Sequence, residues 1–147
     1  MREIKFRAWD HQLKKMIEVF ELSWFEDTYL VNGVLPCDKP MVYMQYTGLK
    51  DKTGKEIYEG DIVKSYESHY HHTYIAEVKF GPWECNCGDY YCDGYGIGWY
   101  VVGPNWYERP TDRFWTIATR TLSEYRQKWS VLGNIYEDSE LLKDRNG

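Results

Sequence analysis

The residues of this chain best suited to chemistry are three closely spaced cysteines with two histidines upstream. One residue separates Cys85 from Cys87, four separate Cys87 from Cys92, and His71 and His72 precede them. Zinc is held by four nitrogen or sulfur ligands in a tetrahedron, a set that three thiolates and one imidazole would complete. The sequence therefore predicts a zinc site made of Cys85, Cys87, Cys92 and one of the two histidines.

The same stretch has a plainer interpretation. Paired zinc ligands are usually separated by two to four residues, which is wider than the spacing of Cys85 and Cys87. The surrounding segment, Gly81–Gly98, is rich in glycine and tyrosine and has no periodicity. The alternative to a zinc site is an irregular loop whose reduced cysteines hold no metal. Zinc is the one cofactor that the sequence suggests.

Four acidic residues form a second chemical group, Asp51, Glu56, Glu59 and Asp61. Their carboxylates could serve as general acids and bases or bind Mg²⁺. However, glycines punctuate the same stretch, and turns select Asp and Gly for backbone reasons alone. We interpret the acids as solvated turn residues, and we expect Asp61 to bond nearby amides after Gly60. No nucleophile elbow or metalloprotease motif occurs, so we assign no catalytic residue and expect a non-enzymatic protein.

Composition favours a soluble β protein. The 147 residues include 7 Trp, 14 Tyr and 5 Phe, and aromatic side chains fit a pleated, half-buried sheet. The net charge of −5, without a block of Lys or Arg, disfavours a general nucleic-acid binder, which must neutralise phosphates. No apolar run approaches about 18 residues and none of signal-peptide length opens the chain, so we expect a cytoplasmic protein without a membrane segment.

Local patterns predict a series of strands and turns. We expect a hairpin around the polar segment Asp10–Lys15, and a second at Asn32-Gly33, the strongest short hairpin signal. Further strands are expected at these segments: Met41–Thr47, Ile62–Lys64, Ile75–Phe80, Trp99–Val102, Phe114–Thr119 and Val131–Tyr136. A short helix is expected over Leu122–Trp129, and a last helical turn over Ser139–Lys143, capped by Asp138.

Three segments carry a resemblance to a known family. The long central one, Met44–Val63, reads MQYTGLKDKTGKEIYEGDIV and closely resembles the signature of the YopX family, small proteins encoded by bacteriophages and prophages. The opening Arg2–Asp10, followed by Lys15-Met16, is similar to the start of that family. Val131–Asp138, leading to Glu140–Leu142, is similar to its end. Segment Gly81–Gly98 is not part of the family pattern.

The resemblance implies a mainly β fold, namely a small SH3-like β-barrel with additional N-terminal β-hairpins and a short C-terminal helical turn. We expect one YopX-like domain over residues 1–147, in which an N-terminal β lobe of residues 1–40 packs on a barrel of residues 41–147. The resemblance implies no known reaction and a cytoplasmic location in the bacterial host cell.

Three functions follow as hypotheses. The leading one is a phage or prophage accessory protein that acts as a binding or self-assembling module, forms a homo-oligomer and binds a host or phage protein. It would associate through β-sheet edges and aromatic side chains, residues that are enriched at interfaces. The alternatives are a nucleic-acid-associated accessory protein, by analogy with other small barrels, and a zinc-binding protein.

Overall fold

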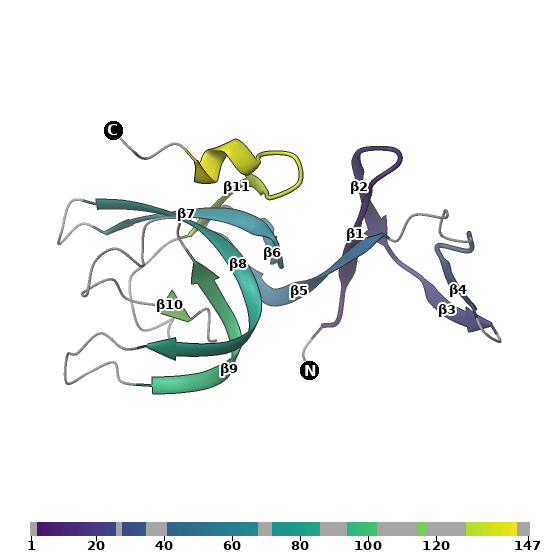
Figure 1. The fold of residues 1–147 in the computed structure, drawn as a ribbon, viewed down its shortest axis with the longest axis horizontal. Helices are drawn as coiled ribbons and strands as arrows, with labels where there is room; N and C mark the ends of the chain where they lie inside the picture. The colour runs from purple at the N-terminus through teal and green to yellow at the C-terminus, as the bar shows by residue number, and fades with distance from the viewer. Residues whose placement is uncertain are drawn as a thin grey trace.

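The computed structural model describes residues 3–25, 28–34, 41–67, 72–85, 94–102, 115–116 and 129–143. These ranges form antiparallel strands and one 3₁₀ helix, so the mainly β fold is confirmed (Figure 1). No helix within them is long and apolar enough to span a membrane. The helix expected at Leu122–Trp129 lies outside the described residues except for Trp129.

A four-stranded sheet contains the beginning of the chain, with strand order β2-β1-β5-β6. Its strands are β1 (Phe6–Asp10), β2 (Lys15–Val19), β5 (Val42–Lys50) and β6 (Glu56–Tyr58). The predicted first hairpin is confirmed, and Asp10 Oδ1 fixes its turn by accepting the amides of Gln12 and Leu13, both at 2.8 Å. Pairing of β1 with β5 joins residues 6–9 and 42–45 in one sheet, and the expected division at residue 40 stays a prediction.

A five-stranded sheet follows, with strand order β10-β9-β8-β7-β11. Its strands are β7 (Asp61–Glu67), β8 (His72–Cys85), β9 (Gly94–Val102), β10 (Trp115–Thr116) and β11 (Ser130–Asn134). Figure 1 shows that the long strands β8 and β9 curl strongly, so the sheet forms a half-barrel. This architecture is consistent with the small barrel that the family resemblance implies.

The expectation of an irregular segment over Gly81–Gly98 is wrong at both ends. Gly81 pairs with Gly98, and the ladder continues to Cys85 opposite Gly94. Backbone hydrogen bonds hold such a hairpin together, and they do not require the alternation of side chains by which strands are recognised in a sequence.

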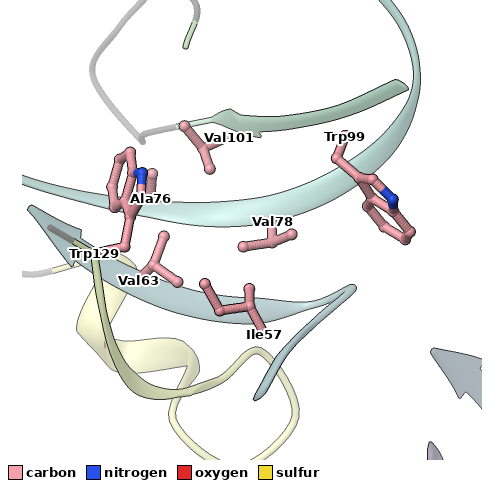
Figure 2. Packing of buried hydrophobic residues seen from close by; sticks show 7 residues of the cluster. All are labelled: Ile57, Val63, Ala76, Val78, Trp99, Val101 and Trp129. Carbon is pink, nitrogen blue, oxygen red and sulfur yellow. The ribbon is translucent and has the colours of Figure 1, made fainter. Parts of the chain in front are cut away.

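The hydrophobic core lies within the curled sheet. Figure 2 shows seven buried residues of this cluster, contributed by β6 to β9 and by the residue before β11: Ile57, Val63, Ala76, Val78, Trp99, Val101 and Trp129. The pairs Ala76/Val78 and Trp99/Val101 are two residues apart, which places each pair on one face of its strand. The two-residue alternation of apolar side chains in these strands therefore determines which residues enter the core.

A separate two-stranded sheet is formed by β3 (Leu22–Phe25) and β4 (Thr28–Val31). The predicted Asn32-Gly33 turn is present, with both residues at positive φ (53° and 74°), as a type I′ hairpin turn requires. The strand after it was expected to pair with β4. In the described residues this pairing is limited to one bridge between Val31 and Val34, and β4 pairs instead with β3 before it.

The C-terminal helical turn is a 3₁₀ helix, η1 (Ser139–Leu142). The expected cap by Asp138 is wrong, because its side chain makes no capping hydrogen bond to η1. Asp138 Oδ2 instead accepts the amide of Asn134 at 3.0 Å. Asn134 Oδ1 accepts the amides of Tyr136 and Glu137 in turn, so the carboxylate stabilises the turn that precedes the helix.

The position of Asp138 in this turn leaves no room for a side chain at Gly133, so alanine there would force the Asp138 carboxylate to move. A Cβ at Gly133 would clash with the carboxylate of Asp138. We expect Gly133→Ala to lower the free energy of unfolding by about 1–2 kcal/mol, since the Asn134 amide loses its acceptor. Urea unfolding measures this, with Gly98→Ala as the matched control, because a Cβ at Gly98 meets nothing within 4 Å. Equal effects of the two substitutions would contradict the explanation.

Candidate functional site

The predicted metal ligands lie largely outside the described residues. His71, Cys87 and Cys92 are outside them, and of His72 and Cys85 only the backbone is described, as the first and last residues of β8. Because β8 curls, its two ends lie toward the same side of the molecule (Figure 1). Among the described side chains, no group of three or more His, Cys, Asp or Glu residues is arranged to hold a metal ion. The zinc site stays a prediction.

The four predicted acids are described, and Asp61 is the most deeply buried of them, at 1% exposure. Its Oδ2 accepts the amide of Tyr58 at 2.8 Å, which confirms the predicted turn bond. Its Oδ1 lies 2.7 Å from Nη2 of Arg7 in β1. Burial raises the pKa of Asp61, while the charge of Arg7 and the Tyr58 amide oppose that rise. The pair therefore holds the first sheet against the start of β7.

Arg7 is itself fixed by several contacts. Its Nη2 donates to the carbonyl oxygen of Glu59 at 3.2 Å, and its guanidinium carbon lies 4.8 Å from the ring centre of Tyr58. Guanidinium groups stack favourably on aromatic faces at such distances. Arg7 thus contacts β6, the turn that follows it and the start of β7, and its charge is used within the protein.

Asp51 stabilises the tip between β5 and β6. Its Oδ1 accepts the Thr53 amide and hydroxyl, both at 2.7 Å, and the Lys55 amide at 3.0 Å. Its Oδ2 accepts the amide of Val131 in β11 at 3.0 Å. Burial alone would raise the pKa of Asp51, but these hydrogen bonds outweigh burial and hold the pKa well below its usual range.

Glu56 is likewise paired. Its Oε1 accepts a hydrogen bond from Lys5 Nζ at 2.6 Å, and its Oε2 accepts one from the Tyr58 hydroxyl at 2.9 Å. Lys5, and then Tyr58, lower the pKa of Glu56. Asp51, Glu56 and Asp61 thus act as structural residues, as expected, but Asp51 and Asp61 are buried, so their description as solvated residues is wrong.

Several large apolar side chains of the described residues are exposed, and four of them lie close together in the sequence or fold around one hairpin. Four large side chains near β3 and β4 are exposed to solvent: Phe20 (79%), Leu22 (39%), Trp24 (79%) and Val34 (66%). We call these four residues the hairpin surface. Phe20, Leu22 and Trp24 alternate along the chain, which in an extended segment directs them to the same side. Figure 1 shows the β3–β4 hairpin at the opposite end of the molecule from the curled sheet.

The hairpin is held in place by Asn32 and Tyr29. The Asn32 side chain donates to the Glu18 carbonyl at 2.8 Å and accepts the amides of Phe20 and Glu21 at 3.0 and 3.2 Å. The Tyr29 ring contacts Tyr43 of β5 edge-on, with centroids 6.2 Å apart. These contacts fix the base of the hairpin, while Trp24 contacts the Tyr29 ring at 5.5 Å and remains mostly exposed.

The sequence matches the family described as YopX protein over residues 5–143, nearly the whole chain. The chain belongs to the YopX family. The family resemblance of the three sequence segments is thereby confirmed.

One solved structure and the curated proteins complete the comparison. The crystal structure of protein EF1440 from Enterococcus faecalis is 27% identical, with 97% of this chain and 99% of that chain covered, and a TM-score of 0.48. No curated protein matches the sequence.

The hairpin surface is the part of the site that the sequence did not reveal. Aromatic residues are more numerous in the second half of the chain than in the segment around Phe20 and Trp24, so the second half attracts attention first. The available signal was the alternation of Phe20, Leu22 and Trp24, which predicts one common face. Alternation alone does not say whether that face is covered.

Proposed function

We propose that this YopX-family protein is a non-enzymatic binding module, and that it takes a protein partner on the hairpin surface. The observation that carries the proposal is the exposure of Phe20 and Trp24, each 79%, four residues apart on one segment. Contiguous apolar patches on soluble monomers are small, and larger ones mark interaction sites. Tyr, Trp and Phe are also the residues enriched at protein interfaces.

The state of the charged residues supports a binding role over catalysis. Asp51, Glu56 and Asp61 each bond to groups of the protein itself. A catalytic carboxylate needs to face a substrate with a proton to transfer. The nucleic-acid hypothesis draws no support from the hairpin surface, since Glu18 and Glu21 beside it are exposed and acidic. Zinc binding and a phage or prophage origin remain predictions beside this proposal.

Selection from a displayed library of random peptides tests the proposal. Peptides selected on the full-length protein are expected to bind the double variant Phe20→Ser/Trp24→Ser at least about tenfold more weakly, because buried aromatic anchors dominate binding energy. Ile97→Ser is the matched control, since Ile97 is equally exposed at 79% but belongs to β9 of the curled sheet. Peptides that bind the double variant as tightly as the wild type would overturn the proposal.

A further inference from the structure

The Asn32-Gly33 turn joins two groups that can react with each other. Asparagine is thermally labile because the backbone nitrogen of the next residue can attack its side-chain carbonyl carbon. Glycine has no side chain to hinder a close approach of this kind. Gly33 is exposed, a Cβ there would meet nothing within 4 Å, and its amide donates no hydrogen bond within the part of the chain that the structure describes. The attacking nitrogen is therefore free.

The carbon that this nitrogen would attack is held in place. Asn32 Oδ1 accepts the amides of Phe20 and Glu21 at 3.0 and 3.2 Å, and Nδ2 donates to the Glu18 carbonyl at 2.8 Å. Attack makes Cγ tetrahedral, which moves both atoms out of the plane in which they are bonded. The ring that forms also aligns Cβ of Asn32 with the Gly33 nitrogen, a rotation that a left-handed residue of a type I′ turn does not have. The reaction therefore requires the turn to open.

Opening of this hairpin is a local event. β3 and β4 form a two-stranded sheet, and among the described strands neither joins another sheet. Hairpins of two strands are at best marginally stable in water, so this one belongs to the parts of a fold that open most readily. Two backbone hydrogen bonds between Val31 and Val34, at 2.9 and 3.0 Å, close the turn, and the ring contact of Tyr29 with Tyr43 joins the hairpin to β5.

We propose that Asn32 is a self-modification site whose deamidation permanently releases the β3–β4 hairpin from β2; this inference goes beyond the proposed function and does not depend on it. In the open turn, the Gly33 nitrogen loses its proton to water and bonds to Asn32 Cγ. The Cγ–Nδ2 bond breaks, and Nδ2 takes up a proton and leaves as ammonia. Water then adds to one carbonyl carbon of the cyclic imide and opens the ring. The products are aspartate and isoaspartate, and no oxidant or cofactor is needed.

Neither product restores the contacts of the carboxamide. An aspartate still accepts the amides of Phe20 and Glu21, but it sets a carboxylate oxygen against the Glu18 carbonyl, to which Nδ2 donates in the unmodified chain. The carboxylates of Glu18 and Glu21 are exposed beside this position, and like charges repel. An isoaspartate routes the backbone through Cβ and lengthens a turn whose length fixes the strand register. Because ammonia is lost, the change does not reverse.

Peptide mapping of the full-length protein by mass spectrometry, during incubation at mildly alkaline pH, tests the reaction. We expect Asn32 to deamidate at least about tenfold more slowly in the folded protein than in the urea-unfolded chain, because attack waits for the minority open state. Mapping separates Asn32 from Asn146-Gly147, the other Asn-Gly pair of the sequence. Asn134 is the control, since its Oδ1 also accepts two backbone amides but Ile135 follows it. Equal rates at Asn32 in the two states, or reaction of Asn134 as fast as that of Asn32, would overturn the inference.

Two variants test whether hairpin opening sets the rate. Tyr29→Ala removes the contact with Tyr43 and should raise the folded-state rate at Asn32 at least about threefold. Thr28→Ala is the matched control, because Thr28 is exposed on the same strand and should leave the rate within about twofold of the wild type. If both variants react at the wild-type rate, opening of the hairpin does not control the reaction and the inference fails.

Asn32→Asp reproduces one product and tests the consequence. Amide hydrogen exchange of Val31 and Val34, whose bonds close the turn, is expected to be at least about tenfold faster in this variant than in the wild type. The amides of β7 and β8, which belong to another sheet, should exchange as in the wild type and show that the variant is folded. Unchanged exchange at both valines would refute release of the hairpin.

Discussion

Replacing Arg7 with methionine is expected to lower the free energy of unfolding by about 3–5 kcal/mol, because it leaves a buried carboxylate without its counter-charge. Asp61 is 1% exposed, and Arg7 Nη2 is 2.7 Å from its Oδ1. The substitution also removes the hydrogen bond to the Glu59 carbonyl and the stacking on Tyr58. Methionine keeps much of the length of the side chain, so the loss reflects charge and hydrogen bonds more than packing. Urea unfolding at neutral pH measures the difference.

Two comparisons separate this explanation from a general loss of charge. Lys79→Met removes a cation from the more exposed pair Lys79–Glu77, at 3.4 Å, and should change stability by less than about 1 kcal/mol. In the Arg7→Met background, Asp61→Asn should recover part of the loss, since it removes the uncompensated charge. If Arg7→Met and Lys79→Met had similar effects, the Arg7–Asp61 pair would not have the role assigned to it.

The deficit of Arg7→Met should also depend on pH in a defined direction. Burial raises the pKa of Asp61 already in the wild type, and removal of Arg7 takes away a charge that opposes this rise. When the pKa of a carboxyl is higher in the folded than in the unfolded state, its protonation stabilises the folded state. The deficit should therefore shrink as the pH falls toward the folded-state pKa and be largest above it.

Replacing Asp51 with alanine is expected to cost about 2–4 kcal/mol of stability. The change leaves the amides of Thr53, Lys55 and Val131 without their acceptor, and buried unsatisfied donors are costly. It also removes the hydrogen-bonded link between the β5–β6 tip and β11, which lie 80 residues apart in the sequence. The midpoint of urea unfolding, with Lys52→Ala on the exposed tip as the control, measures the effect.

The sign of the accompanying pH effect follows from the hydrogen bonds. Because the pKa of Asp51 is lower in the folded than in the unfolded protein, its contribution is complete above the unfolded-state pKa of about 4. It is lost progressively as the pH falls below that value. Wild type and Asp51→Ala should therefore converge in stability on acidification. A difference that stays constant down to acidic pH would contradict the assigned role of the ionised carboxylate.

The parts of this fold that depend on neighbouring residues could be predicted from the sequence. The Asn32-Gly33 turn and the bond from Tyr58 to Asp61 involve residues at most three apart, so their patterns carry the information. The family signature gave the mainly β class. The contact of Arg7 with the Glu59 carbonyl spans 52 residues and that of Asp51 with Val131 spans 80, and no local pattern specifies which distant groups meet.

The candidate site was harder to predict than the fold. Whether an apolar side chain is covered depends on what the rest of the chain places over it, which is why Val31 is 5% exposed and nearby Val34 is 66% exposed. Both residues have the same type and flank the same turn. The hairpin surface could therefore be identified only from exposure in the folded chain, while the cysteine and histidine positions were evident from composition and spacing.

The side chain of Asn32 has a consequence for how copies of this protein can assemble. β2 is an edge strand of the four-stranded sheet, and such edges are templates for runaway strand addition. The Asn32 carboxamide bonds to the Glu18 carbonyl and the Phe20 amide, two positions that an added strand would need. One side chain thus blunts that end of the edge against fibril-like growth.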